Sequence, residues 1–272
     1  MKALDRLHAD SPRYTPLALF LAMTMVPVVA ALALDARMFQ GIPVWIKPLK
    51  FLVSLVVYLL TLAWMARFAD TATTQRAGWR WHECAVVVAV LLEMVWIGGA
   101  AAMGVGSHYN VSNRLMAVTY PMMGLAAILL TTASTTLAVA IHRNPNTGLS
   151  PPLKSGLVWG LGLTLPLTLI TAGTLSAMPG HWVGGTPSDA GGLPLMGWSR
   201  DGGDLRVAHF FATHALHGVP ALVFLAALLQ RGDAAGSSAR FIAPGVGALY
   251  AALVFGTFGQ ALMGHPVLAG WG

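Results

Sequence analysis

Charged residues are scarce in this chain. Asp, Glu, Lys and Arg make up only 10% of its 272 residues, against about 25% in a typical soluble domain. Hydrophobic residues make up 56%, and the mean hydropathy is +0.67. So little charge cannot cover a water-facing surface, and the composition therefore excludes an ordinary soluble domain.

Cysteine and basic clusters are also lacking. Cys84 is the only cysteine, which excludes an internal disulfide and a thiolate metal cluster. The net charge is +6, but the basic residues form no stripe with interleaved aromatic residues, so the sequence argues against a nucleic-acid partner. The last apolar run, 241–263, has no lysine for a Schiff base, which argues against a retinal protein.

Long apolar runs are what the chain has instead. Each covers roughly 20 residues, the length of a helix that crosses a bilayer, and is too long for a barrel strand of about ten residues. The sequence thus predicts an all-α, polytopic membrane protein with seven transmembrane helices in one bundle domain, residues 1–272, embedded in a lipid bilayer. The expected spans lie near 16–34, 49–67, 84–103, 116–141, 156–177, 206–229 and 241–263.

The distribution of Lys and Arg predicts the orientation of these helices. With the N-terminus in the cytoplasm and the C-terminus outside, most basic residues fall on the cytoplasmic side, in agreement with the positive-inside rule. Connections on that side are short, whereas the outer loop 178–205 is long and rich in Gly, Pro and Trp. Long ordered loops often carry function, so we expect a site on the outer side.

Histidines gather at the start of the expected span 206–229. At about 100° per residue, Arg206, His209, Thr213, His214 and His217 fall within one arc of about 140°. Lipid disfavours such a polar face. We therefore expect it to line an outward-facing interior cavity or to bind a cofactor.

Arg206 lies in the first turn of this span, two residues after Asp204. Asp204 is well placed to cap the helix. Cations are disfavoured at a helix N-terminus, so Arg206 is expected to have an anionic partner, which is Asp201, Asp204 or a carboxylate of a ligand.

Glu93 is the only acidic residue inside any expected span. A charged side chain in the bilayer is costly unless it is paired, so Glu93 is a candidate catalytic residue; the alternative is a protonated Glu that bonds a neighbouring helix. Glu93 lies about 15 Å below the outer interface, and His214 and His217 lie about 12 and 16 Å below it. We therefore expect Glu93 to share one layer with His214 or His217.

Lys47, Lys50 and His108 complete the candidate cofactor-binding residues. Lys47 and Lys50 share one helix face. They either reach the outer headgroups or pair with an anion, which is Asp201, Asp204, a heme propionate or another bound anion. His108, in the polar segment 107–110, either belongs to an ordinary turn or folds over the outer mouth of the cavity beside His209.

Three segments resemble an uncharacterised family of bacterial polytopic membrane proteins: WIKPLKF at 45–51, SHYN at 107–110 and GGDLRVAHF at 202–210. The resemblance implies a multi-pass protein of the bacterial inner membrane and brings no assigned activity. A looser likeness to heme A synthases is architectural. Because their paired Glu and His pattern is missing around Glu93, their residues are not carried over.

These features favour a protein that binds heme b or a transition metal for a redox or electron-transfer role, with a small molecule or a quinone as substrate. His209, His214 and His217 would be the ligands, and Arg206, Lys47 or Lys50 would hold the propionates. One alternative is a proton-coupled transporter in which Glu93 and the histidines titrate, although no inverted repeat is visible. Another is a zinc-dependent intramembrane hydrolase with the three histidines as ligands and Glu93 as the base.

Overall fold

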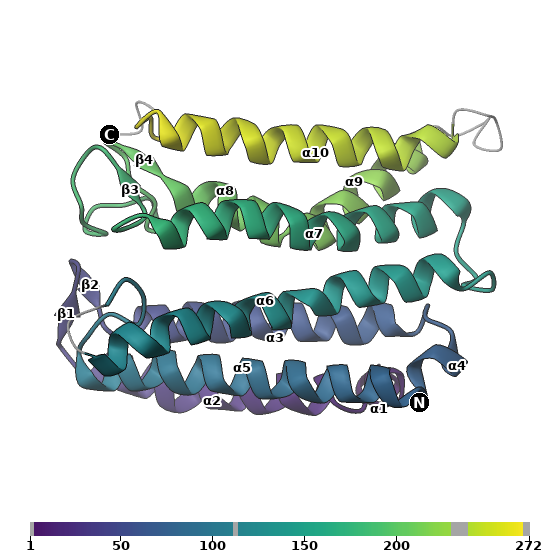
Figure 1. Ribbon diagram of the computed structural model, residues 1–272, viewed down its shortest axis with the longest axis horizontal. Coiled ribbons are helices and arrows are strands. Elements are labelled where there is room, and N and C mark those ends of the chain that lie inside the picture. Colours follow the sequence, from purple (N-terminus) through teal and green to yellow (C-terminus); the bar gives the residue numbers. More distant parts are fainter. Residues whose placement is uncertain (1–2, 111–113, 230–238, 269–272) are drawn as a thin grey trace. The chain divides into compact units, whose positions relative to one another are not determined.

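Long apolar helices form most of the structure. The computed structural model describes residues 3–110, 114–229 and 239–268 (Figure 1). Among these residues, six helices are long and apolar enough to cross a membrane, and a bent pair of helices makes a seventh if it counts as one span. The six are α2 (Tyr14–Leu34), α3 (Ile46–Ala66), α5 (Ala77–Met103), α6 (Arg114–Arg143), α7 (Pro151–Ala177) and α10 (Ala239–Leu262). The multi-pass helical character agrees with the sequence, while the orientation stays a prediction.

Short elements connect the long helices. Two pairs of short strands are antiparallel, with Met38 paired to Pro43 in the first pair and Trp182 paired to Asp204 in the second. The second pair joins the two ends of the long loop between α7 and α8. The short elements are α1 (Ala3–Asp10), β1 (Met38–Phe39), β2 (Ile42–Pro43), α4 (Thr71–Thr74), β3 (Trp182–Val183), β4 (Gly203–Asp204), α8 (Leu205–Thr213) and α9 (Ala215–Leu229).

The chain divides into two compact units, Met1–Ala133 and Ser134–Gly272. Each unit is described by itself below. Unit 1 contains α1 to α5 and most of α6, and unit 2 contains the end of α6 and α7 to α10. The expected single bundle domain stays a prediction.

Unit 1 is built around α3, which packs against α2 and α5. The leucines of α3 that are buried recur every three or four residues, as one helix face requires; they are Leu52, Leu55, Leu59 and Leu62. Ion pairs Arg67–Asp10 at 2.8 Å and Arg13–Glu83 at 2.9 Å lie at one end of the unit. At the other end, Arg37 donates to the carbonyl of Ala102. The three helices α2, α3 and α5 therefore alternate in direction.

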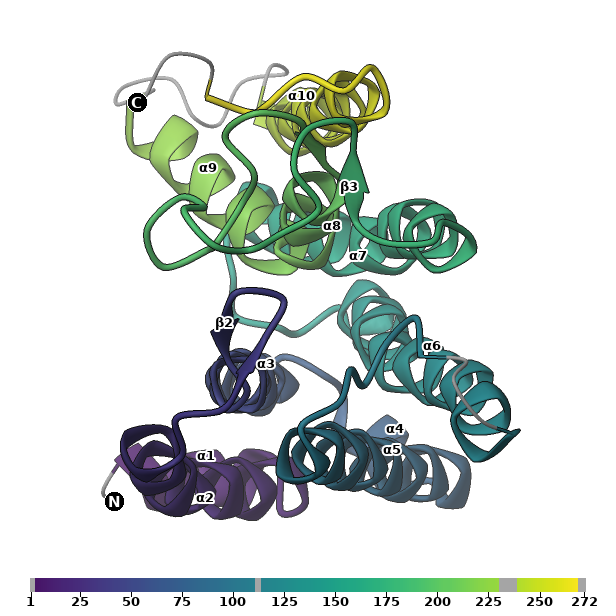
Figure 2. The ribbon, with the colours of Figure 1, turned by 90° about the vertical axis from the view of Figure 1, so that its left-hand side faces the viewer.

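Unit 2 places α7 against α8, α9 and α10, as Figure 2 shows. The close approach of α7 to α9 depends on two glycines of a small-xxx-small pattern. A Cβ on Gly160 would lie only 2.6 Å from Cδ of Pro220, and a Cβ on Gly156 would lie 3.0 Å from Cβ of Val223. Buried apolar side chains of the same helices complete the core, among them Leu167, Val219 and Val254.

We expect Gly160→Leu to destabilise unit 2 by about 1–3 kcal/mol, because the added side chain forces α7 away from α9. Gly162→Leu is the matched control, since a Cβ there meets nothing within 4 Å. Thermal unfolding of the purified protein in detergent measures both effects. Equal unfolding temperatures for the two variants would show that this contact is not tight.

Two expected spans differ most from the structure. The third was expected to begin at residue 84, but α5 begins at Ala77 and includes Glu83. Apolarity marks the part of a helix that lies in lipid, whereas the helix itself continues into the polar residues before it. Glu93 is therefore not the only acidic residue of a spanning helix; Glu83 is the other, and it pairs with Arg13.

The sixth expected span, 206–229, is not one helix. It is broken between α8 and α9, which are bent by 63°. His214 lies at the break, with φ −96° and ψ 6°. Pro220, in the second turn of α9, has no N–H for the carbonyl four residues earlier, which weakens the start of this helix. The expected arc of polar residues assumed a straight helix and is wrong beyond Thr213.

Candidate functional site

Three histidines surround the break between α8 and α9. The ring of His214 stacks on Phe210 with centroids 4.0 Å apart, and the rings of His214 and His217 lie 5.7 Å apart. His209 lies on α8, one turn before Thr213, and interacts electrostatically with His214. All three imidazoles are half-buried. The structure thus brings together the histidines that the sequence singled out, on a bent segment instead of one face.

The hydrogen bonds of His214 determine which ring nitrogen carries the proton. Its Nδ1 lies 2.7 Å from the carbonyl oxygen of Phe210. A carbonyl only accepts, so Nδ1 donates and Nε2 keeps a lone pair. Thr213 Oγ1 also lies near Nδ1, at 3.2 Å. Within the part of the chain that the structure describes, Nε2 of His214 has no hydrogen-bond partner.

His209 is held in the same way from the neighbouring helix. Its Nδ1 lies 3.4 Å from Oγ1 of Thr171 on α7. The Thr171 hydroxyl donates to the carbonyl of Leu167 at 2.9 Å, so it accepts from Nδ1–H of His209. Nε2 of His209 is then the basic nitrogen, and it too lacks a hydrogen-bond partner among the described residues. Both imidazoles are therefore held by a hydrogen bond from Nδ1, and the lone pair of Nε2 is available to bind a metal ion or a proton.

Thr168 adds a buried polar group on α7, one turn before Thr171. It shares the face of α7 with Thr164 and Thr171, and only 8% of it is exposed. Its hydroxyl has no hydrogen-bond partner in the described ranges. A buried hydroxyl without a partner lowers the stability of the folded state by about 1–3 kcal/mol. A polar group of a ligand could therefore bind at this face of α7.

The three histidines do not form a metal-binding group of three ligands. No group of three or more His, Cys, Asp or Glu residues that could hold a metal ion occurs among the described residues. The bend explains the difference from the expectation, because residues on either side of it no longer share one helix face. Neither of two cavities found in the described residues is lined by these imidazoles.

Arg206 is bound by carboxylates of the loop before it. Its Nη2 lies 2.6 Å from Asp204 and 2.8 Å from Asp189, and it donates to the carbonyl of Gly197 at 2.7 Å. Asp204 also caps α8 by accepting from the Arg206 backbone N–H, as expected. His181 contacts Asp189 at 3.2 Å. We call Arg206, Asp189, Asp204 and His181 the loop network.

The loop network corrects the expected partners of Arg206. Asp201 is not among them, since it accepts hydrogen bonds from Thr186 and Ser199. The sequence did not predict Asp189 as a partner of Arg206, because the two residues are seventeen positions apart and no local pattern connects them. Arg206 thus holds the loop onto α8, and its expected contact with a heme propionate stays a prediction.

Two carboxyl groups of the loop have lowered pKa values. Burial raises the pKa of Asp189, but hydrogen bonds and charges from His181 and Arg206 outweigh this and lower it below the usual range. Hydrogen bonds from Thr186 and Ser199 lower the pKa of Asp201. A carboxyl whose pKa is lower in the folded state stabilises the fold above its unfolded pKa, near 3.9. That stabilisation is lost as the pH falls through the folded value.

We therefore expect the loop 178–204 to loosen between about pH 4 and pH 2. Hydrogen exchange of the loop amides, corrected for the intrinsic effect of pH, measures this. Asp189→Asn, which removes one of the titrating groups, should flatten the pH dependence. Protection that stays constant from pH 5 to pH 2 in the wild-type protein would contradict the expectation.

The candidate residues of unit 1 form a second cluster. Glu93 is 4% exposed, and Lys47 is the charged side chain that acts on it electrostatically. His108 Nδ1 lies 3.1 Å from Oγ of Ser107, and its ring lies 6.1 Å from that of Phe51. The segments 45–51 and 107–110 therefore meet in the fold. Lys50 is exposed one turn after Lys47.

The two clusters lie in different units. The expected layer of Glu93 with His214 or His217, and the expected approach of His108 to His209, stay predictions. No protein-family model, curated protein or solved structure matches this chain. The resemblance to a bacterial membrane family therefore stays a prediction as well.

Proposed function

We propose that this chain is a bacterial inner-membrane protein that binds a redox cofactor, heme b or a transition metal, through Nε2 of His214 or His209. The observation that supports it is the tautomer of these imidazoles. A histidine that ligates a metal usually donates its other ring N–H to a carbonyl, a carboxylate or water. His214 does so toward Phe210 O, whereas Nδ1 of His209 donates to a hydroxyl, Thr171 Oγ1.

The surroundings of the imidazoles suit such a group in part. Phe210 stacks on His214, and its ring lies 5.6 Å from that of Phe211, so aromatic side chains border this imidazole, as they would border a heme. The bound group would supply one-electron transfer. The chain's own residues would hold it, orient the imidazoles and exclude water, and a quinone or another lipid-soluble molecule would exchange the electron.

A proton-coupled transporter is the second candidate, and the broken sixth span favours it. Broken spans with titratable side chains at the break line the binding sites of many transporters. Here the 63° bend lies at His214, between His209 and His217. The zinc hydrolase is not proposed again, because it needed all three imidazoles as ligands.

The deciding experiment is a visible spectrum of the purified protein, oxidised and reduced, together with elemental analysis. The cofactor proposal expects a Soret band that shifts on reduction, or one transition metal per chain. A protein with neither would refute it. Proton uptake by proteoliposomes, lost in His214→Ala, would then support the transporter.

A further inference from the structure

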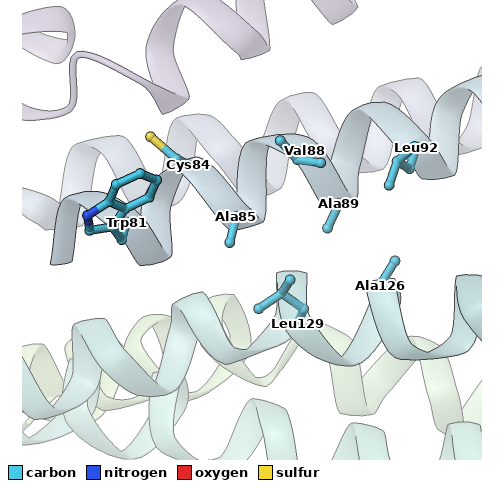
Figure 3. Close-up of a pocket in the computed structure, with 8 residues that line it drawn as sticks. All are labelled: Trp81, Cys84, Ala85, Val88, Ala89, Leu92, Ala126 and Leu129. Atoms are coloured by element: carbon cyan, nitrogen blue, oxygen red, sulfur yellow. The ribbon is translucent and has the colours of Figure 1, made fainter. Parts of the chain in front are cut away.

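An apolar groove runs along unit 1 between α5 and α6 (Figure 3). Its volume is about 360 Å³. The residues that line it are Trp81, Cys84, Ala85, Val88, Ala89, Leu92, Ala126 and Leu129. Nearly all the surface they present is carbon, so the groove suits a hydrocarbon chain.

Small side chains create the groove. Ala85 and Ala89 on α5 face Leu129 and Ala126 on α6, and an alanine leaves the space that a leucine would fill (Figure 3). Val88 and Leu92 are 54% and 50% exposed. The groove is therefore open to the medium around the helices, which in a bilayer is lipid.

The length of the groove matches one leaflet. From Trp81 to Leu92 the helix rises about 16 Å, at 1.5 Å per residue. The hydrocarbon core of a bilayer is about 30 Å thick, so the groove reaches from one interface to near the midplane. A single acyl chain of a lipid in that leaflet has this extent.

Two arginines lie at the start of α5, near the end of the groove at Trp81. Arg76 and Arg80 are exposed, and neither guanidinium has a hydrogen-bond or ion-pair partner in the part of the chain that the structure describes. Trp81, which is 75% exposed, is the residue type that anchors helices at the headgroup level. Arg13 differs, because Glu83 already pairs with it. The free charge at this end favours an anionic headgroup.

We propose that the groove binds one acyl chain of an anionic phospholipid, whose phosphate pairs with Arg80 and Arg76. The apolar lining holds the chain, and the two arginines select the headgroup. A quinone has a neutral headgroup and would gain nothing from these arginines. This inference concerns unit 1 and does not depend on the cofactor.

The test is native mass spectrometry of the full-length protein in mild detergent, with equal amounts of phosphatidylglycerol and phosphatidylcholine of the same acyl chains. We expect one tightly held phosphatidylglycerol. Ala85→Leu should weaken its binding at least tenfold, since each methylene that leaves the groove weakens binding about fourfold. Arg76→Gln with Arg80→Gln should weaken it about fivefold per arginine and remove the preference over phosphatidylcholine.

Matched variants control for general effects. Ala102→Leu adds the same bulk to an exposed position of α5 outside the groove, and Arg143→Gln removes a charge at the exposed end of α6; both should bind phosphatidylglycerol as the wild type does. If Ala85→Leu fails to fold, Ala126→Val fills the same space with less bulk. Unchanged binding in the groove variants overturns the proposal, as does equal binding of phosphatidylcholine by the wild type. A quinone bound to the protein in place of phosphatidylglycerol would also overturn the proposal.

Discussion

His214→Ala is expected to lower the cofactor content of the purified protein at least about tenfold, because imidazole ligation supplies much of the binding free energy of a heme or metal. The substitution removes little apolar surface, so membrane insertion should survive. Thr171→Val, which keeps the shape of the side chain but removes the acceptor for His209 Nδ1–H, should lower the content if His209 is a ligand. Heme absorbance and metal per chain measure the effect.

His142→Ala is the matched control for this experiment. It removes an imidazole from the exposed end of α6 and should leave the cofactor content unchanged. A wild-type protein with full cofactor content and a His214→Ala variant with the same content would show that His214 is not a ligand. If His209→Ala alone empties the site, His209 is the ligand.

Arg206→Ala is expected to destabilise unit 2 by about 3–5 kcal/mol, the usual cost of breaking a buried ion pair on one side. It leaves two carboxylates without their cation, and their side chains are only 1% and 8% exposed. The melting temperature in detergent should fall by several degrees, and the loop 178–204 should become accessible to proteases.

Arg200→Ala separates this effect from a general loss of charge, since Arg200 is an exposed arginine of the same loop; its stability should stay close to that of the wild type. Adding Asp189→Asn to Arg206→Ala should recover part of the loss, because one buried charge is removed. A stability of Arg206→Ala equal to that of Arg200→Ala would mean that the loop network contributes nothing.

Local patterns were enough for the features that depend on neighbouring residues. The long helices follow from apolar runs, because backbone groups in lipid must bond within their own helix. Asp204 as the cap of α8 follows from its position before the helix and a side chain that accepts from the first turn. The closeness of His214 and His217 follows from their spacing of three residues.

Only the tertiary structure decided the features that depend on distant residues. The pairing of Arg206 with Asp189 needs the paired strands β3 and β4, which fold the loop back on α8. The proton positions of His209 depend on Thr171 from another helix. The groove depends on which faces of α5 and α6 oppose each other. By itself the sequence determined the membrane helices and a histidine-rich segment. Packing across helices decided the partners of each charge and the place of the groove, because these energies arise between segments that are far apart in the chain.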